Sequence, residues 1–253
     1  MDRQTPLNGR VAIITGAGRG LGRAIASEFA GAGASVVLAA RSRDQIDDAA
    51  GEIRAAGASA LAVPTDVNET RSVENLIRTT LDHFGDLHVL VNNSGIYTDT
   101  SILNTSDEDW DRVISTNLRG TFLCSRAAGR HFAEKGRGRV INIASNLGVI
   151  GRPGFSAYCA SKAAIIQFTK VAALEWAHFG AQMNAVAPGY FQTEFNAELR
   201  SNDPATAKVI RRIPLQRMGK PDEIAPLCVF LASDAASFIT GETIVLDGGE
   251  SIR

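Results

Sequence analysis

Short, continuous apolar runs alternate along the chain with longer segments in which apolar residues recur every three or four positions. The short runs are rich in Val and Ile and do not alternate with polar residues, which is typical of strands buried on both faces of a sheet. Strands are therefore expected at 11–15, 35–40, 60–63, 88–92, 139–144, 183–187 and 243–246. Helices are expected at about 20–32, 44–56, 70–84, 117–135 and 158–178, with others starting at Ser106 and Pro221.

This alternation of strands and helices predicts one α/β domain over residues 1–253, a Rossmann-type, doubly wound parallel sheet with helices on both faces. The one long segment without a clear pattern is about 189–220. A loop of that length in a compact domain is usually functional, so we expect a substrate loop there that closes as a lid.

Composition argues against nucleic-acid binding, metal binding and a membrane location. The formal net charge is -1, with 26 basic and 27 acidic residues, so no basic field suggests nucleic acid. The three cysteines are scattered and the four histidines have no metal-ligand spacing, which favours a reduced, cytoplasmic protein without a metal. Residues 1–10 are polar and no apolar run approaches ~20 residues, so neither a signal peptide nor a membrane span is expected.

A glycine-rich segment, Thr-Gly-Ala-Gly-Arg-Gly-Leu-Gly at 15–22, lies between the first strand and the first helix. There a doubly wound fold binds a pyrophosphate at the positive end of the helix dipole. The strict G-x-G-x-x-G spacing fails, because from Gly16 the third glycine would fall on Leu21. The wider T-G-x-x-x-G-x-G form fits, with Gly16, Gly20 and Gly22. A glycine-rich turn without a ligand is the plainer alternative.

The end of the second strand favours NADP over NAD. NAD sites usually carry an acid about 20 residues after the glycine segment, but that position holds Ala40 and is followed by Arg41. Arg19 lies within the glycine segment itself. Two guanidinium groups would pair with a 2′-phosphate, although either could be a solvated surface charge, and NAD stays open.

Two polar segments follow the third and fourth strands. Asp66-Val67 could accept a hydrogen bond from an adenine amino group, or Asp66 could cap the next helix. Asn-Asn-Ser-Gly at 92–95 is small and polar, so Asn93 is expected beside a cofactor unless the segment is a simple turn.

Candidate acid–base chemistry lies in Tyr158-Cys-Ala-Ser-Lys162, with Ser145 upstream. Four residues are one helical turn, so Tyr158 and Lys162 share a face. A cation beside a phenol lowers its pKa and suits it to exchange a proton with a hydroxyl/carbonyl pair. Such a pair alone is a weak signal, because Tyr and Lys often lie one turn apart on helix surfaces.

Together these motifs resemble the short-chain dehydrogenase/reductase family across nearly the full length of the chain. The matching positions are Thr15-Gly16-x-x-x-Gly20-x-Gly22, Asp66-Val67, 92–95, Asn117, Ser145, Tyr158-x-x-x-Lys162 and Pro188-Gly189. The family's usual Asn-Asn-Ala-Gly is here Asn-Asn-Ser-Gly, and its frequent Ser-Ser is Ala-Ser at 144–145. No catalytic position is substituted.

The resemblance implies a role for each matching residue. Tyr158 transfers the proton, Lys162 lowers its pKa and binds the nicotinamide ribose, and Ser145 donates to the substrate oxygen. Asn117 holds a water in a proton relay. The residues expected along the nicotinamide are Pro188, Gly189, Phe191 and Thr193. The implied reaction exchanges a hydride between nicotinamide and a substrate carbon.

The substrate stays open at this stage. Pro-Gly-Tyr-Phe-x-Thr-Glu at 188–194 resembles the gluconate 5-dehydrogenase-like group, and the motif set is equally similar to 3-oxoacyl carrier-protein reductases. A carrier protein wants a basic surface near the mouth, which Arg200, Arg211 and Arg212 could provide unless they are merely solvated. Arg152-Pro153, after the fifth strand, could also line the mouth. A hydrolase is disfavoured because no Gly-x-Ser-x-Gly elbow surrounds Ser145. A non-catalytic dinucleotide-binding protein is the remaining alternative.

A homotetramer is expected. The helices at 117–135 and 158–178 carry more apolar residues than one inward stripe needs, which indicates a partner. The family resemblance implies that these helices pair across a two-fold axis, with a second interface near 243–252.

Overall fold

The computed structural model describes residues 5–194 and 197–253, and one seven-stranded sheet runs through them. The strand order is β3-β2-β1-β4-β5-β6-β7 and every pairing is parallel, which confirms the predicted fold class. The strands are β1 (Val11–Thr15), β2 (Ser35–Ala40), β3 (Ala60–Pro64), β4 (Val89–Asn92), β5 (Gly138–Ile143), β6 (Ala181–Pro188) and β7 (Thr243–Leu246).

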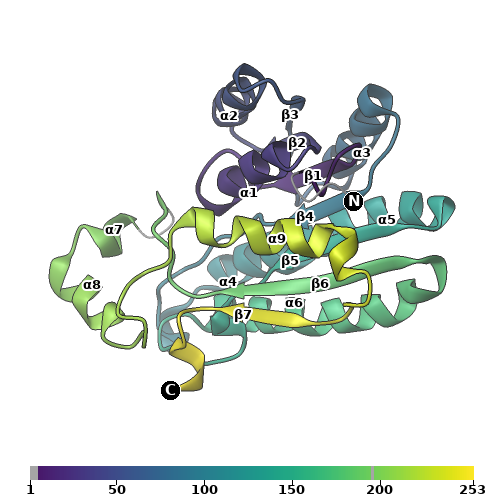
Figure 1. Cartoon of the computed structure of the whole chain (residues 1–253). Coiled ribbons are helices and arrows are strands. Elements are labelled where there is room, and N and C mark those ends of the chain that lie inside the picture. Colours follow the sequence, from purple (N-terminus) through teal and green to yellow (C-terminus); the bar gives the residue numbers. More distant parts are fainter. Residues whose placement is uncertain (1–4, 195–196) are drawn as a thin grey trace.

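Helices cover both faces of the sheet (Figure 1). They are α1 (Gly20–Gly31), α2 (Arg43–Ala55), α3 (Thr70–Phe84), α4 (Asp107–Ile114), α5 (Gly120–Lys135), α6 (Ser156–Trp176), α7 (Ala197–Arg200), α8 (Asp203–Ile210) and α9 (Ala225–Ala232). One core joins the sheet to α1, α2 and α9, and the other joins it to α3, α5 and α6. Successive residues of β1 alternate between them: Ile13 packs in the second core, and Ala12 and Ile14 pack in the first. This two-sided burial explains the continuous apolar runs.

The helices expected from Ser106 and over 117–135 form one continuous helical segment. Ser106 caps α4 as expected, its Oγ accepting a hydrogen bond from the Asp109 N–H at 3.1 Å. A π-helical turn, Ser115–Arg119, then joins α4 to α5 without a break. Such single turns are rare and occur often at functional sites, and this one contains Asn117.

The segment predicted as irregular, 189–220, contains α7 and α8, which project beyond the sheet where β6 ends (Figure 1). Asn202 caps α8 by accepting from the Ala205 N–H at 3.1 Å, with Pro204 in the first turn. The Asn-x-Pro pattern at 202–204 is a helix start signal that the sequence contains. The helix that follows has only 8 residues, too few for a clear apolar periodicity. Residues 195 and 196 of the expected substrate loop lie outside the described residues. Within the described ranges, no helix has the length and apolarity of a membrane span.

Candidate active site

A large cavity of about 1290 Å³ lies across the carboxyl ends of the strands, from β3 through β1 and β4 to β6. In open parallel sheets this edge is where ligands bind, at the point where the strand order reverses. Pockets for drug-sized ligands are about 300–1,000 Å³, so this one has room for a dinucleotide and a second, smaller molecule.

The glycine segment forms the wall of the cavity at the start of α1. Gly16 and Gly20 have φ angles of 64° and 55°, in the left-handed region that favours glycine. Gly22 lies beneath the loop, because a Cβ atom there would stand 2.3 Å from the Gly16 carbonyl oxygen. The cavity is lined by Gly16, Arg19, Gly20 and Leu21. The tight turn brings backbone N–H groups to the positive end of a helix, which fits a pyrophosphate.

Asn93 ties the end of β4 to this glycine loop. Its side-chain amide donates to the carbonyl oxygens of Thr15 and Gly16 at 3.0 and 3.1 Å. The Thr15 hydroxyl oxygen in turn accepts from the N–H groups of Asn93 and Ser94 at 3.0 and 3.1 Å. Asn93 also lines the cavity, and its side-chain amide holds the loop in shape.

The side chains predicted for the adenosine end line the same cavity: Arg19, Arg41, Asp66 and Val67. Both arginines are exposed and therefore free to meet a ligand phosphate. Asp66 does not cap α3, whose N-cap residue is Glu69. Its carboxylate instead accepts from the Asn68 N–H at 2.9 Å and closes the turn after β3.

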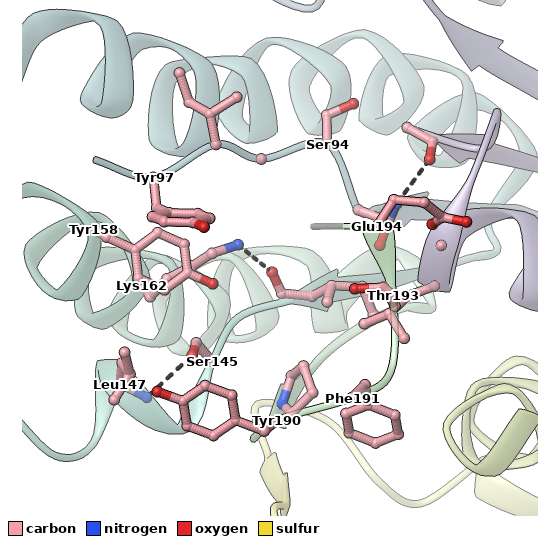
Figure 2. A pocket seen from close by; sticks show the side chains of 18 of the residues that line it. Ser94, Tyr97, Ser145, Leu147, Tyr158, Lys162, Tyr190, Phe191, Thr193 and Glu194 are labelled. Carbon is pink, nitrogen blue, oxygen red and sulfur yellow. Dashed lines mark hydrogen bonds between the residues drawn. The ribbon is translucent and has the colours of Figure 1, made fainter. Parts of the chain in front are cut away.

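Tyr158 and Lys162 of α6 and Ser145 at the end of β5 face one another across the cavity floor (Figure 2). The Lys162 Nζ lies 5.6 Å from the centre of the Tyr158 ring and donates to the Ile143 carbonyl oxygen at 2.7 Å. The Ser145 hydroxyl bonds to the Tyr158 phenol, and its Oγ accepts from the Leu147 N–H at 3.1 Å. The three candidate acid–base residues of the sequence therefore lie together in the cavity.

Burial has the largest effect on the pKa values of Tyr158 and Lys162. It raises the pKa of Tyr158 to about 12, although the hydrogen bond from Ser145 acts in the opposite direction. Burial also lowers the pKa of Lys162 to about 8, which weakens it as a source of positive charge. That Lys162 lowers the pKa of the phenol stays a prediction about the complex with cofactor.

Asn117 lies behind the cavity and is fully buried in the π-helical turn. Its Oδ1 accepts from the Ile96 N–H at 2.8 Å, and its Nδ2 donates to the Ile96 carbonyl and the Ser161 hydroxyl at 2.9 and 3.0 Å. Asn117 therefore connects the loop after β4 to α6, beside Tyr158 and Lys162.

The segment after β6 forms another part of the cavity lining. Pro188, Gly189, Phe191 and Thr193 line the cavity, and the Thr193 side chain lies next to Gly20 of the glycine loop. Among the four arginines considered for a basic mouth, only Arg152 and Arg212 line the cavity.

A family model described as Enoyl-(Acyl carrier protein) reductase matches residues 16–251. The chain belongs to the short-chain dehydrogenase/reductase family. A 3-oxoacyl-[acyl-carrier-protein] reductase from Synechocystis is 44% identical over 247 residues, which are 97% of this chain and 98% of that protein. As a member of this family the protein is an oxidoreductase that acts on a CH–OH/C=O pair with a nicotinamide cofactor.

Solved structures of family members agree with the fold. A putative NAD(P)-dependent gluconate 5-dehydrogenase from Beutenbergia cavernae, with bound NADP, has a TM-score of 0.94 and 39% identity, covering 99% of this chain and 100% of that one. A gluconate 5-dehydrogenase from Burkholderia cenocepacia, in complex with NADP and tartrate, has a TM-score of 0.95 and 35% identity, covering 99% and 98%.

Sequence reasoning missed an aromatic cluster beside Tyr158. The rings of Tyr97 and Phe155 stack at 5.6 Å, and the Tyr158 ring meets them edge-on at 6.3 and 6.5 Å. Tyr97 lies two residues after the Asn-Asn-Ser-Gly segment, so its position was a usable signal. Phe155 is brought in by the bridge between 100 and 155, which no local pattern indicates.

Proposed function

We propose that Tyr158 exchanges the proton on the substrate oxygen while NADP supplies or accepts the hydride. The observation that carries this proposal is the convergence of Tyr158, Ser145 and Lys162 in a dinucleotide-sized cavity. A phenol that stays protonated at neutral pH is ready to act as the acid when a carbonyl is reduced. Ser145 is placed to donate to the same oxygen.

Lys162 and Asn117 support this proton transfer. We infer that Lys162 leaves the Ile143 carbonyl to bind the nicotinamide ribose when cofactor is bound, which brings its charge to the phenol. Asn117 then holds the water that resupplies the proton. A Cβ atom on Gly95 would lie 3.4 Å from Asn117 Oδ1 and 3.5 Å from Lys162 Nζ, so both side chains lie against the backbone of the loop after β4.

NADP is the preferred cofactor in this proposal, because Arg19 and Arg41 line the adenosine end of the cavity. Replacing Arg41 with Asp should lower kcat/KM for NADPH on the order of 10–100-fold, since a hydrogen bond to a charged group contributes ~1.5–3 kcal/mol. The kcat/KM for NADH should rise or stay constant. Steady-state kinetics with both cofactors measure this.

Arg43→Asp is the matched control, because Arg43 is exposed at the start of α2 and does not line the cavity. It should change neither cofactor's kinetics. A wild-type protein that prefers NADH would contradict the assignment.

Two substrate classes fit this site. A 3-oxoacyl thioester is favoured by the Synechocystis relative and the family model, both described by carrier-protein substrates. A sugar acid or another small ketone is favoured by the gluconate 5-dehydrogenases, one of which was solved with NADP and the dicarboxylate tartrate. A panel of acetoacetyl thioesters, 5-keto-D-gluconate and simple ketones, assayed with NADPH, tests the function. Cofactor binding without turnover of any member would indicate a non-catalytic dinucleotide-binding protein.

We further propose a homotetramer. Phe122 of α5 and Val171 and Leu174 of α6 are exposed on one face, and Leu174 is 83% exposed. A second set lies near the edge strand β7, with Phe238 and Ile252 almost fully exposed. Apolar groups of this size are usually covered by a partner, and two separate faces give a dimer of dimers.

Light scattering coupled to size exclusion should therefore give four times the 26.8 kDa chain mass. Leu174→Glu should reduce it to a smaller species. A wild-type monomer at micromolar concentration would refute the assembly.

Two further expectations belong to this proposal. Residues 189–220 would act as the substrate loop, since Tyr190, Leu199 and Val209 line the cavity. A cytoplasmic location is supported by the three cysteines, all of them free thiols.

A further inference from the structure

Three basic side chains gather where the substrate loop meets the cavity. Arg152 comes from the segment between β5 and α6, Lys208 from α8, and Arg212 from the turn after α8. All three line the cavity, and we refer to them as the basic cluster.

Arg152 is held firmly in place. Its side chain is only 10% exposed, and its Nη2 donates to the Glu250 Oε1 at 2.8 Å. Its guanidinium carbon lies 4.9 Å from the centre of the Tyr190 ring, which also lines the cavity. A buried, stacked and paired arginine is a preorganised group rather than a solvated surface charge.

One carboxylate serves two guanidinium groups. Glu250, whose side chain is 4% exposed, also lies 3.7 Å from the Arg212 Nε through the same Oε1. Its Oε2 accepts from the Asn146 amide at 2.9 Å. The Arg212 Nε is buried and has no hydrogen-bond partner among the described residues. The two arginines therefore carry one positive charge more than Glu250 balances, and Lys208 adds another.

The titration of Arg152 agrees with this shortage of negative charge. Burial lowers the pKa of Arg152, and repulsion by Arg212 lowers it further, while Glu250 acts in the opposite direction. Three acids line the cavity, but none forms an ion pair with the basic cluster within the described ranges. Glu194 lies near Gly20, Asp66 follows β3, and Asp99 lies against Gly154.

The basic cluster is close to the reacting groups. Glu250 joins Arg152 to Asn146, and Asn146 directly follows Ser145. A molecule whose carbonyl oxygen lies at Ser145 and Tyr158 would therefore extend its remaining atoms toward Arg152 and Arg212. An anionic oxygen group there would accept hydrogen bonds from the guanidinium groups and balance the excess charge.

We infer that Arg152 and Arg212, assisted by Lys208, bind an anionic oxygen group carried by the substrate, a carboxylate or a phosphate. This rests on the proposed function, because it concerns the substrate of the same site. A small keto acid would bring the group as its own carboxylate, and a thioester would bring it as the phosphate of its pantetheine arm. In either case the enzyme discriminates against ketones that lack the charge.

Matched substrates separate these sources. The first pair is 5-keto-D-gluconate and its neutral amide. The second pair is acetoacetyl coenzyme A and acetoacetyl-N-acetylcysteamine, which lacks the phosphates. Arg212→Gln should lower kcat/KM for an anionic member on the order of 10–100-fold, mostly through KM, and leave its neutral partner unchanged. Arg211→Gln is the matched control, since Arg211 is adjacent, exposed and outside the cavity lining, and it should change neither pair.

The pair that loses activity identifies the anionic group that is bound. A loss confined to the first pair identifies the carboxylate, and one confined to the second identifies the phosphate. An equal loss for charged and neutral members, or no loss, would overturn the inference while the proposed function stands. Absence of turnover of every compound would instead count against the proposed function. In that case, calorimetric titration of D-gluconate and of coenzyme A into the NADP⁺-loaded protein tests the inference about the basic cluster. Binding that Arg212→Gln weakens supports it, and no binding, or binding that is unchanged in the variant, refutes it.

Discussion

Tyr158→Phe should lower kcat by about 10²–10⁴-fold, the usual contribution of a positioned general acid. The substitution removes the hydroxyl but keeps the ring, which packs edge-on against Tyr97 and Phe155. Thermal stability and NADPH affinity should therefore change little. Because the phenol transfers its proton only in the transition state, the loss should appear in kcat rather than in KM.

Tyr97→Phe is the informative comparison. It removes a hydroxyl from the same aromatic cluster and retains a ring that stacks on Phe155 at 5.6 Å. Its effect on kcat should be far smaller, since the proposed proton transfer uses the Tyr158 hydroxyl, to which Ser145 bonds. Near-normal turnover by Tyr158→Phe, or equal losses in the two variants, would remove Tyr158 from its proposed role.

Local patterns were sufficient for the framework of the site. The strands bury both faces, so their continuous apolar runs were readable, and a parallel sheet then fixes which loops share its carboxyl edge. Gly16, Gly20 and Gly22 were recognisable because a tight turn beneath a helix start needs residues without a side chain. Tyr158 and Lys162 share one helical turn, which is also a local relation.

What the sequence did not indicate depends on distant contacts. Arg152 and Glu250 are 98 positions apart, and only the folded chain brings their charges together in a buried pair. The π-helical turn at Asn117 lacks a proline or another local breaker. It is held by side-chain hydrogen bonds to the loop after β4 and to Ser161.

The titration of Tyr158 depends on burial, which local sequence patterns do not show. Sequence spacing shows which charge lies nearby, but it does not show how much water the fold removes. Here desolvation raises the pKa of the phenol and lowers that of the ammonium, and the Ile143 carbonyl takes up the Lys162 donor. Catalytic competence then depends on what a bound cofactor does to Lys162.

The same burial gives a prediction about Lys162 that does not depend on substrate. Its pKa falls from 10.5 in the unfolded chain to about 8 in the folded, cofactor-free protein. Between these values the unfolded state binds more protons, so the free energy of unfolding rises with pH in that window. From pH 7 to pH 10 this group alone should add about 2–3 kcal/mol to the stability of wild type.

Lys162→Met isolates that contribution, since it keeps a long apolar stem and removes the titrating group. The wild-type minus variant free energy of unfolding, from urea titrations at one protein concentration, should rise by that amount between pH 7 and pH 10. Other groups largely cancel in the difference. The Tyr158 phenol, with its raised pKa, lowers stability only above about pH 10. Parallel curves for the two proteins would mean that Lys162 keeps its ordinary pKa after folding. Saturating NADP⁺ should flatten the difference, because a ribose hydroxyl at Lys162 would stabilise its charged form.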